Sequence, residues 1–306
     1  MKTMKLGKTG LDVPVIALGC MRLAGAERKQ AEEFLRTALD LGLNFFDHAD
    51  IYGGGQCETV FADLIASAGI NREDLILQSK CAIVPGKMYD FSKKHILDSV
   101  DGILKRLNTD YLDVLLLHRP DALMEPEEVA EAIDALETSG KVRHFGVSNQ
   151  DPYTMELLQK SIRQPIAANQ LQLSITNATM ISQPMNMNIA DGCDPVLDGG
   201  VLNYCRLHDI TIQTWSPFQY GFFEGAFIGS EKYPELNRKL DEIAARHNVT
   251  NTTVALAWIL RHPAKMQAVT GTINPKRLVE CAKAAELTLS REEWYELYLA
   301  AGHRLP

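Results

Sequence analysis

The chain has 306 residues, of which 46% are hydrophobic, 23% charged and 7% aromatic, an ordinary composition for a globular protein with a large core. Its net charge of −8 argues against a nucleic-acid or anionic-membrane partner, because both attract basic surfaces. The sequence has no signal peptide, no apolar run near the ~18 residues of a membrane helix and no C-x-x-C pair among its six cysteines, so we expect a cytoplasmic protein with reduced thiols.

Strand-like and helix-like segments alternate from one end of the chain to the other. Short apolar runs predict eight strands, at 13–19, 44–47, 75–80, 111–118, 142–149, 166–173, 210–217 and 266–271. Apolar residues at helical spacing predict helices at 26–42, 57–69, 92–108, 126–141, 151–161, 201–209, 234–247, 251–262 and 275–286, with a last helix near 290–301 outside the repeat. Cap signals support several bounds, such as Ser92 before one helix and Gly42 and Gly69 after two others.

Eight strand–helix units predict an α/β fold, a closed (β/α)8 TIM barrel of parallel strands covered by helices. An open doubly wound sheet is the alternative, disfavoured because no strand is followed by G-x-G-x-x-G. Residues 1–16 have the pattern of a β-hairpin that turns at Gly10 and caps the barrel. No linker composition interrupts the chain, so we expect a single domain over 1–306. The stretch 171–198 is irregular and long for a connection between a strand and a helix, which is typical of a functional loop.

Polar side chains stand where the predicted strands end, the rim at which such barrels carry their active sites. Four of them are Asp47, Lys80 and His118, at the ends of the second, third and fourth strands, and Tyr52, in the loop after the second. A lysine ammonium near a phenol makes the phenol proton easier to give away, and Asp47 can pair with the buried lysine. His118 can hold a carbonyl oxygen. The set suits protonation of a carbonyl oxygen while a hydride arrives from a cofactor.

The motifs FFDHADIYGGGQCE, LLLHRPD, GVSN, NQLQ and TWSP, taken with Lys80, resemble those of the aldo-keto reductase superfamily, in order and over nearly the whole chain. The resemblance implies a barrel with an N-terminal hairpin and an oxidoreductase that reduces a small aldehyde or ketone with NADPH, NADH being less favoured. It implies a catalytic tetrad of Asp47, Tyr52, Lys80 and His118, in which Tyr52 is the general acid.

The resemblance also assigns residues to the cofactor. By position these are Ser148, Asn149 and Gln170 for the nicotinamide carboxamide; Trp215 for stacking on its ring; Ser216, Pro217, Phe218 and Gly221 for the pyrophosphate; Gly271, Thr272, Arg277 and Glu280 for the 2′-phosphate and adenine; and Gly19 and Met21 after the first strand. Two positions depart from the family pattern, since Gly271 stands where many members carry lysine and Cys281 where many carry asparagine. The missing positive charge bears on how strongly NADPH is preferred over NADH.

Two other functions use the same residues differently. Some members of the superfamily are cofactor-sensing regulatory subunits of a partner such as an ion channel. A barrel hydrolase would use Asp47 or Asp50 with Glu58, but no second strand-end carboxylate is well placed as a partner.

Metal and thiol chemistry are not expected. His48, Asp50 and His118 match no zinc spacing. Cys57 and Cys81 lie next to the candidate site in sequence and are either thiols of lowered pKa or, as we expect, buried and inert.

The substrate pocket is predicted from loops rather than from strands. Its candidates are Met21, Arg22, His48, Tyr89, Phe218 and the 171–198 loop, whose methionines in MISQPMNMN form either an adaptable apolar wall or packing under the loop. The chain ends soon after the last predicted helix, so we expect an open pocket. The sequence predicts neither the substrate nor the oligomeric state.

Overall fold

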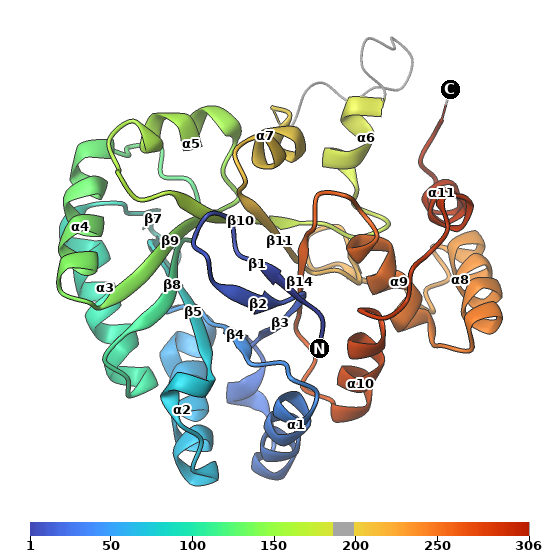
Figure 1. The fold of residues 1–306 in the computed structure, drawn as a ribbon, viewed down its shortest axis with the longest axis horizontal. Coiled ribbons are helices and arrows are strands. Elements are labelled where there is room, and N and C mark those ends of the chain that lie inside the picture. The colour runs from blue at the N-terminus through green and yellow to red at the C-terminus, as the bar shows by residue number, and fades with distance from the viewer. Residues whose placement is uncertain (186–198, 306) are drawn as a thin grey trace.

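The computed structural model describes residues 1–185 and 199–305, and its core is a closed barrel of eight parallel strands (Figure 1). The barrel strands are β3 (Ile16–Gly19), β4 (Phe45–Asp47), β5 (Ile76–Cys81), β8 (Leu112–Leu117), β9 (Val142–Ser148), β10 (Ile166–Gln172), β11 (Thr211–Trp215) and β14 (Gln267–Thr270). Each barrel strand pairs with the next one along the chain, and β14 pairs with β3, which closes the ring. The predicted (β/α)8 barrel is confirmed.

Helices cover the outside of the barrel (Figure 1). They are α1 (Arg28–Asp40), α2 (Gln56–Ala68), α3 (Lys93–Leu107), α4 (Pro126–Thr138), α5 (Pro152–Gln159), α6 (Thr179–Met185), α7 (Val201–Leu207), α8 (Pro234–His247), α9 (Asn251–Leu260), α10 (Pro275–Lys283) and α11 (Arg291–Ala300), with short 3-10 helices at Leu23–Gly25, Tyr52–Gly55 and Arg72–Asp74. The helix outside the repeat, α11, is fastened by Trp294, whose ring stacks on Trp258 of α9 with centroids 4.7 Å apart. Each of these indole N–H groups donates to the backbone oxygen of the other residue at 3.0 Å.

The N-terminal hairpin closes one end of the barrel, as predicted. Strands β1 (Thr3–Lys5) and β2 (Asp12–Pro14) pair antiparallel and lie across the bottom end of the barrel (Figure 1). Leu6 and Val13 are fully buried and pack with interior side chains of the barrel such as Phe45. The backbone N–H of Gly7 donates to Thr211 Oγ1 at 2.8 Å. The hairpin therefore fills the bottom of the barrel with apolar side chains.

The barrel interior becomes more polar toward the opposite end. Alternate residues of a strand point to the same face, so Ile76, Gln78 and Lys80 of β5 all point inward. Ile76 belongs to the apolar layer beneath, and Lys80 lies at the carboxyl end. Gln78 lies between these two residues, and it connects the apolar layer to the polar side chains at the carboxyl end of the barrel.

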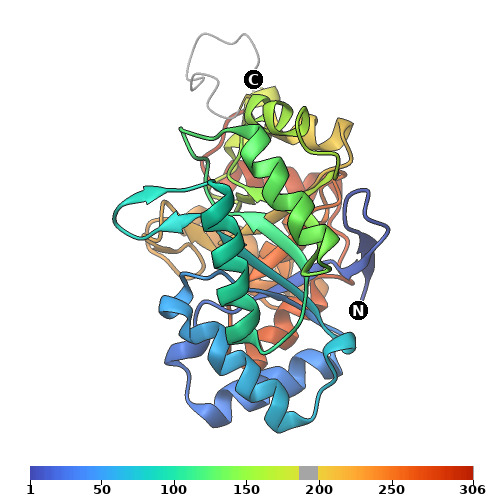
Figure 2. The same cartoon turned by 90° about the vertical axis from the view of Figure 1, so that its left-hand side faces the viewer.

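Two short hairpins were missed by the sequence analysis. They are β6 (Ile83–Val84) with β7 (Met88–Tyr89), and β12 (Gln219–Tyr220) with β13 (Gly225–Ala226). Figure 2 shows β6 and β7 projecting from the barrel on the side opposite to the N-terminal hairpin. Each strand has only two residues, too few to show an apolar period.

The predicted irregular stretch at 171–198 is partly helical. It begins inside β10 and contains α6. Residues 186–198, which include Cys193 and the last residues of MISQPMNMN, lie outside the described residues. Among the described helices, none combines the length and apolarity needed to span a bilayer.

Candidate active site

The ammonium group of Lys80 joins Asp47 and Tyr52 at the carboxyl end of the barrel. Lys80 Nζ lies 2.7 Å from Asp47 Oδ2, and it donates to the backbone oxygen of His48 at 2.8 Å and to Tyr52 Oη at 3.2 Å. Lys80 is fully buried and Asp47 is 2% exposed, so the three ammonium hydrogens are paired with protein atoms rather than with water. Three of the four predicted catalytic residues thus form one hydrogen-bonded unit.

Burial and charge oppose each other in this unit. Burial raises the pKa of Tyr52, and the Lys80 ammonium lowers it by a smaller amount, so the pKa lies above the usual phenol value. The lowering that we expected from Lys80 is present but is outweighed by burial. Burial lowers the pKa of Lys80, and attraction to Asp47 and Tyr52 raises it by more. At neutral pH the site holds a protonated phenol beside a charged ammonium.

Three glycines shape the loop that presents Tyr52. The glycines at 53–55 have φ angles of 58°, 63° and 91°, in the left-handed region that glycine adopts without strain. A Cβ on Gly55 would lie 2.7 Å from Arg106 Cδ. Arg106 is fixed in turn, because its Nε donates to Glu58 Oε2 at 2.7 Å. The glycine run lets the chain turn sharply past Arg106 into α2 just after the phenol.

Two amides hold the second oxygen of Asp47. Gln78 Nε2 donates to Asp47 Oδ1 at 2.6 Å, and Gln170 Nε2 donates to the same atom at 3.1 Å. Gln170 Nε2 also lies 3.2 Å from Gln213 Oε1. Both amide hydrogens of Gln170 are used in this way, so its Oε1 remains available to accept a hydrogen bond from a ligand.

The amide chain continues across the barrel to the N-terminal hairpin. Gln213 Nε2 donates to Gln78 Oε1 at 3.0 Å and to Gln267 Oε1 at 2.8 Å. Gln267 Nε2 donates to the backbone oxygen of Pro14 at 2.7 Å. Gln78, Gln213 and Gln267 are fully buried. Each amide fixes the orientation of its neighbour, so the position of the Asp47 carboxylate is coupled to the base of the barrel.

His118 stands beside the phenol. The rings of His118 and Tyr52 are 6.1 Å apart between centroids, with planes at 82°. Burial, together with the charges of Lys80 and Arg119, lowers the pKa of His118 to about 2. The imidazole is therefore neutral, and one of its nitrogens carries a hydrogen that can be donated to a carbonyl oxygen.

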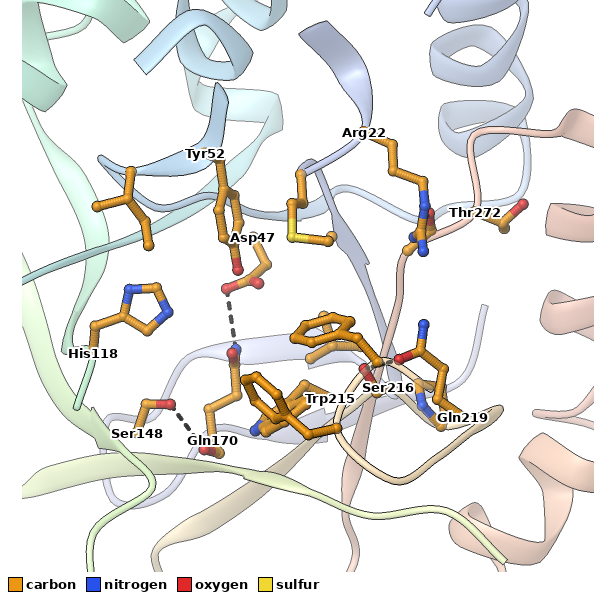
Figure 3. Close-up of a pocket in the computed structure, with 18 of the residues that line it drawn as sticks. Arg22, Asp47, Tyr52, His118, Ser148, Gln170, Trp215, Ser216, Gln219 and Thr272 are labelled. Atoms are coloured by element: carbon orange, nitrogen blue, oxygen red, sulfur yellow. Dashed lines mark hydrogen bonds between the residues drawn. The ribbon is translucent and has the colours of Figure 1, made fainter. Parts of the chain in front are cut away.

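A cavity of about 1590 Å³ opens above these residues. It exceeds the ~300–1,000 Å³ of pockets that hold one small ligand. Figure 3 shows His118 and Ser148 on one side, Arg22 and Thr272 on the other, and Tyr52 between them. The predicted cofactor residues that line it are Gly19, Met21, Ser148, Asn149, Gln170, Trp215, Ser216, Pro217, Phe218, Gly271, Thr272 and Arg277.

Three of the residues that we predicted for the substrate or the cofactor do not line the cavity. His48, expected in the substrate pocket, is fully buried, and burial lowers its pKa to about 3. Gly221 follows β12 and does not line the cavity. Glu280 does not line it either, because Arg277 and Cys281, four residues apart, share the face of α10 that does. A motif match places these residues near the site but does not say which way each one points.

An aromatic wall forms around Trp215 at the end of β11. Trp215 Nε1 donates to Asn149 Oδ1 at 3.2 Å, which fixes the plane of the indole. Phe222 and Phe223 pack against the indole with centroids 6.3 and 6.1 Å away. The cavity therefore offers a flat aromatic surface near the phenol, suited to stacking on a planar ring.

The guanidinium of Arg22 lies over Gly271. Arg22 Nη1 donates to the backbone oxygen of Gly271 at 2.7 Å. A Cβ on Gly271 would lie 2.5 Å from the same nitrogen. Arg22, which we predicted for the substrate pocket, thus adds a positive charge where the side chain of residue 271 is missing, at the end of the cavity lined by Thr272 and Arg277.

The alternative chemistries find little support in the site. Burial raises the pKa of both Cys57 and Cys81, as the expectation of inert thiols requires. Asp50 and Glu58, named for a hydrolase, do not line the cavity. Across 1–185 and 199–305, no group of three or more His, Cys, Asp or Glu side chains is arranged to hold a metal ion.

The sequence analysis missed Gln78, Gln213 and Gln267 as parts of the site. Their signal is a single amide inside each of three otherwise apolar strands, in LILQSK, ITIQTW and MQAVTG. It also missed Arg119, which follows His118 in the motif LLLHRPD and lines the cavity.

At the carboxyl ends of the parallel strands, a tyrosine, a lysine and an aspartate are joined by hydrogen bonds, and a cavity with an aromatic wall lies above them. This arrangement is typical of a cofactor-dependent oxidoreductase. The Aldo/keto reductase family profile matches residues 15–298, and the chain belongs to that family of oxidoreductases.

Individual relatives resemble the chain over most of its length. It is 35% identical to the uncharacterized oxidoreductase YcsN of Bacillus subtilis, over 89% of this chain and 88% of that protein. It is 33% identical to a 6-dehydroglucose reductase of Agrobacterium fabrum, over 95% of each chain. A solved aldo-keto reductase of Klebsiella pneumoniae in complex with NADPH superposes with a TM-score of 0.78 at 25% identity, over 100% of this chain and 96% of that one.

Proposed function

We propose that this protein is an NADPH-dependent reductase that converts an aldehyde or ketone to an alcohol, with residues 1–306 acting as one domain. The observation that carries the proposal is Lys80, which is bonded to both Asp47 and Tyr52 beneath a large cavity. A buried ammonium that donates to a protonated phenol is suited to stabilise the phenolate left after proton transfer.

Each member of the proposed tetrad has one task. Tyr52 gives its proton to the carbonyl oxygen as general acid. Lys80 keeps a hydrogen bond on the phenol oxygen as negative charge develops there, and Asp47 keeps Lys80 charged. His118 donates its N–H to the same carbonyl oxygen and orients it. The cofactor, when bound, supplies the hydride to the carbonyl carbon.

The residues around the cavity fit a nicotinamide dinucleotide. Gln170 Oε1 can accept a hydrogen bond from the carboxamide, and Trp215 provides a face for the ring. At the other end, Thr272 and Arg277 would hold the 2′-phosphate, and Arg22 adds a second positive charge. Two cations at that end favour NADPH over NADH, and the NADPH complex of the Klebsiella pneumoniae relative supports this assignment.

The regulatory-subunit alternative would use the same cavity for cofactor sensing. The complete unit of Asp47, Tyr52 and Lys80 favours turnover over sensing alone, because sensing does not need a proton donor at the cavity floor.

The test compares the wild type with Tyr52→Phe, which keeps the ring and removes the acidic proton. We expect the wild type to oxidise NADPH in the presence of a panel of aldehydes and ketones. The rate of Tyr52→Phe should be lower by a factor of about 10²–10⁴. Calorimetric titration should show that NADPH still binds the variant. Tyr153→Phe, at an 81% exposed position, is the matched control.

Two outcomes would count against the proposal. Equal rates in Tyr52→Phe and the wild type would exclude Tyr52 as the acid. Tight NADPH binding with no carbonyl turnover in the wild type would favour the regulatory alternative.

A further inference from the structure

One positive charge in the cavity has no role in the proposed mechanism. Arg119 follows His118 at the end of β8, lines the cavity and is only partly exposed. Its guanidinium carbon lies 5.9 Å from the ring centroid of Trp215 and 5.9 Å from that of Phe222. The guanidinium therefore lies against the aromatic wall near the proposed reaction centre, where the rings shield it partly from water.

Arg119 has no anionic partner of its own. Within 1–185 and 199–305, neither a hydrogen bond nor an ion pair is made by its side chain, whereas Arg72, Arg106 and Arg163 each pair with a carboxylate. A guanidinium that is partly removed from water without a partner is destabilising. Binding of an anion in the cavity would offset that cost.

The cavity as a whole has a charge opposite to that of the protein. The chain carries a net charge of −8, yet the charged residues that line the cavity, among those that the structure describes, are the cations Arg22, Lys87, Arg119 and Arg277 and one acid, Asp47. Asp47 is already neutralised by Lys80. The cavity therefore attracts anions, and its walls of low dielectric strengthen that attraction.

Three of the four cations can be placed relative to the proposed cofactor and substrate. Arg22 is bonded to Gly271 and, with Arg277, lies at the end assigned to the cofactor phosphates. Arg119 is the neighbour of His118, which holds the carbonyl oxygen in the proposed mechanism, and its charge contributes to lowering the pKa of His118. Arg119 thus lies at the substrate end of the cavity, and the proposed binding of the dinucleotide does not use it.

We propose that Arg119 binds a carboxylate on the substrate, so that the enzyme prefers aldehydes or ketones that carry a carboxylate group. A carboxylate suits this site because two guanidinium N–H groups can meet its two oxygens side by side. The inference rests on the proposed reductase function and names the class of substrate for the same site.

The first experiment measures kcat/KM with matched pairs of aldehydes. The pairs are 3- and 4-formylbenzoate and the corresponding formylbenzamides, which have the same shape without the charge. We expect the wild type to prefer the carboxylate of at least one pair, and Arg119→Gln to reduce that preference about tenfold or more. Arg291→Gln removes the same charge at an exposed position in α11 and should keep the wild-type preference. An equal preference in Arg119→Gln and the wild type would overturn the proposal.

The second experiment does not depend on turnover. Calorimetry with NADPH present, a combination in which the alcohol cannot react, measures binding of 3- and 4-(hydroxymethyl)benzoate and of the matching amides to the wild type and to Arg119→Gln. Tighter binding of a carboxylate that is lost in Arg119→Gln supports the anion site, even if no aldehyde is reduced and the proposed function itself fails. Carboxylate binding that survives the substitution would place the anion elsewhere in the cavity. If Arg119→Gln weakens NADPH as much as the carboxylate, the guanidinium serves the cofactor. Either result would show the proposal to be wrong.

Discussion

The guanidinium of Arg22 occupies the space next to Gly271 in which a side chain at position 271 would begin. The two residues are far apart in sequence, and the absence of a side chain at one makes room for the charge of the other. Arg22, in the loop after β3, thus supplies the positive charge that is missing at position 271.

This relationship predicts the cofactor preference of two variants. Arg22→Gln should raise the Kd for NADPH by about five- to tenfold and the Kd for NADH by less, because the 2′-phosphate loses a charged partner. Introducing Gly271→Lys into Arg22→Gln should restore NADPH binding, since the lysine then has free space. Titration by fluorescence or calorimetry measures both constants. If Arg22→Gln affected the two cofactors equally, Arg22 would not contact the 2′-phosphate.

Lys80→Met should be strongly destabilising. The substitution leaves the Asp47 carboxylate buried without its cation, which costs about 3–5 kcal/mol of the free energy of unfolding. The matched control is Lys5→Met, which breaks the pair of Lys5 with Asp12, 60% and 63% exposed, and should cost ~1 kcal/mol or less. Urea unfolding of the three proteins measures the difference. A similar loss of the free energy of unfolding in the two variants would mean that Asp47 is not part of a buried ion pair with Lys80.

The amide chain inside the barrel predicts coupling between Gln213 and Gln78. Gln213→Leu removes the acceptor and donor used by Gln78 and the donor used by Gln267, and each buried polar group left without a partner costs about 1–3 kcal/mol. The double variant with Gln78→Leu should lose less than the sum of the two single variants, because an apolar pair leaves fewer unpaired groups. A double-mutant cycle by urea unfolding measures the coupling. Strict additivity would contradict the network.

Asp50 predicts a dependence of stability on pH. Burial, reinforced by the nearby Glu58, raises the pKa of Asp50 from 3.8 to about 7 in the folded protein. Well below pH 3.8 the carboxyl is protonated in both the folded and the unfolded state. As the pH rises toward 7, the unfolded state ionises first, so the free energy of unfolding falls. Asp50→Asn removes this loss. As the pH rises from 5 to 8, the free energy of unfolding of the variant should therefore increase by about 2–3 kcal/mol relative to that of the wild type. The exposed control Asp63→Asn should show no such gain, and an equal pH dependence in Asp50→Asn and the wild type would count against the raised pKa.

The barrel could be predicted because its signals are local and repeated. Runs such as YLDVLLLH identify buried strands, and Ser92 caps α3 by accepting from the backbone N–H of His95 as expected. The strand ends then bring Asp47, Lys80 and His118 to one rim, because all barrel strands run in the same direction. The order of the strands was therefore enough to predict that the four candidate catalytic residues lie close together.

The rest of the site depends on contacts between distant segments, for which single residues give no signal. The bond from Arg22 to Gly271 joins two loops at opposite ends of the barrel sequence. His48 is fully buried and Glu280 does not line the cavity, and both placements depend on packing around each backbone. The direction of the pKa shift of Tyr52 could not be predicted without knowing how deeply the phenol is buried, because burial outweighs the charge of Lys80. The orientation of a side chain and the extent of its burial are set by the packed structure and not by its place in the sequence.

The closure of the barrel has a consequence for how the protein is made on the ribosome. Strand β3 is among the first segments to be synthesised, but it pairs with β14, where Ile16 lies opposite Ala268. At ordinary translation speeds the nascent chain waits on the order of 10–50 s between these two strands. During that interval the apolar β3 presents an unpaired edge, and the hairpin lacks the barrel base on which it packs. Until its last strand appears, the emerging chain is therefore open to association with other chains through this edge.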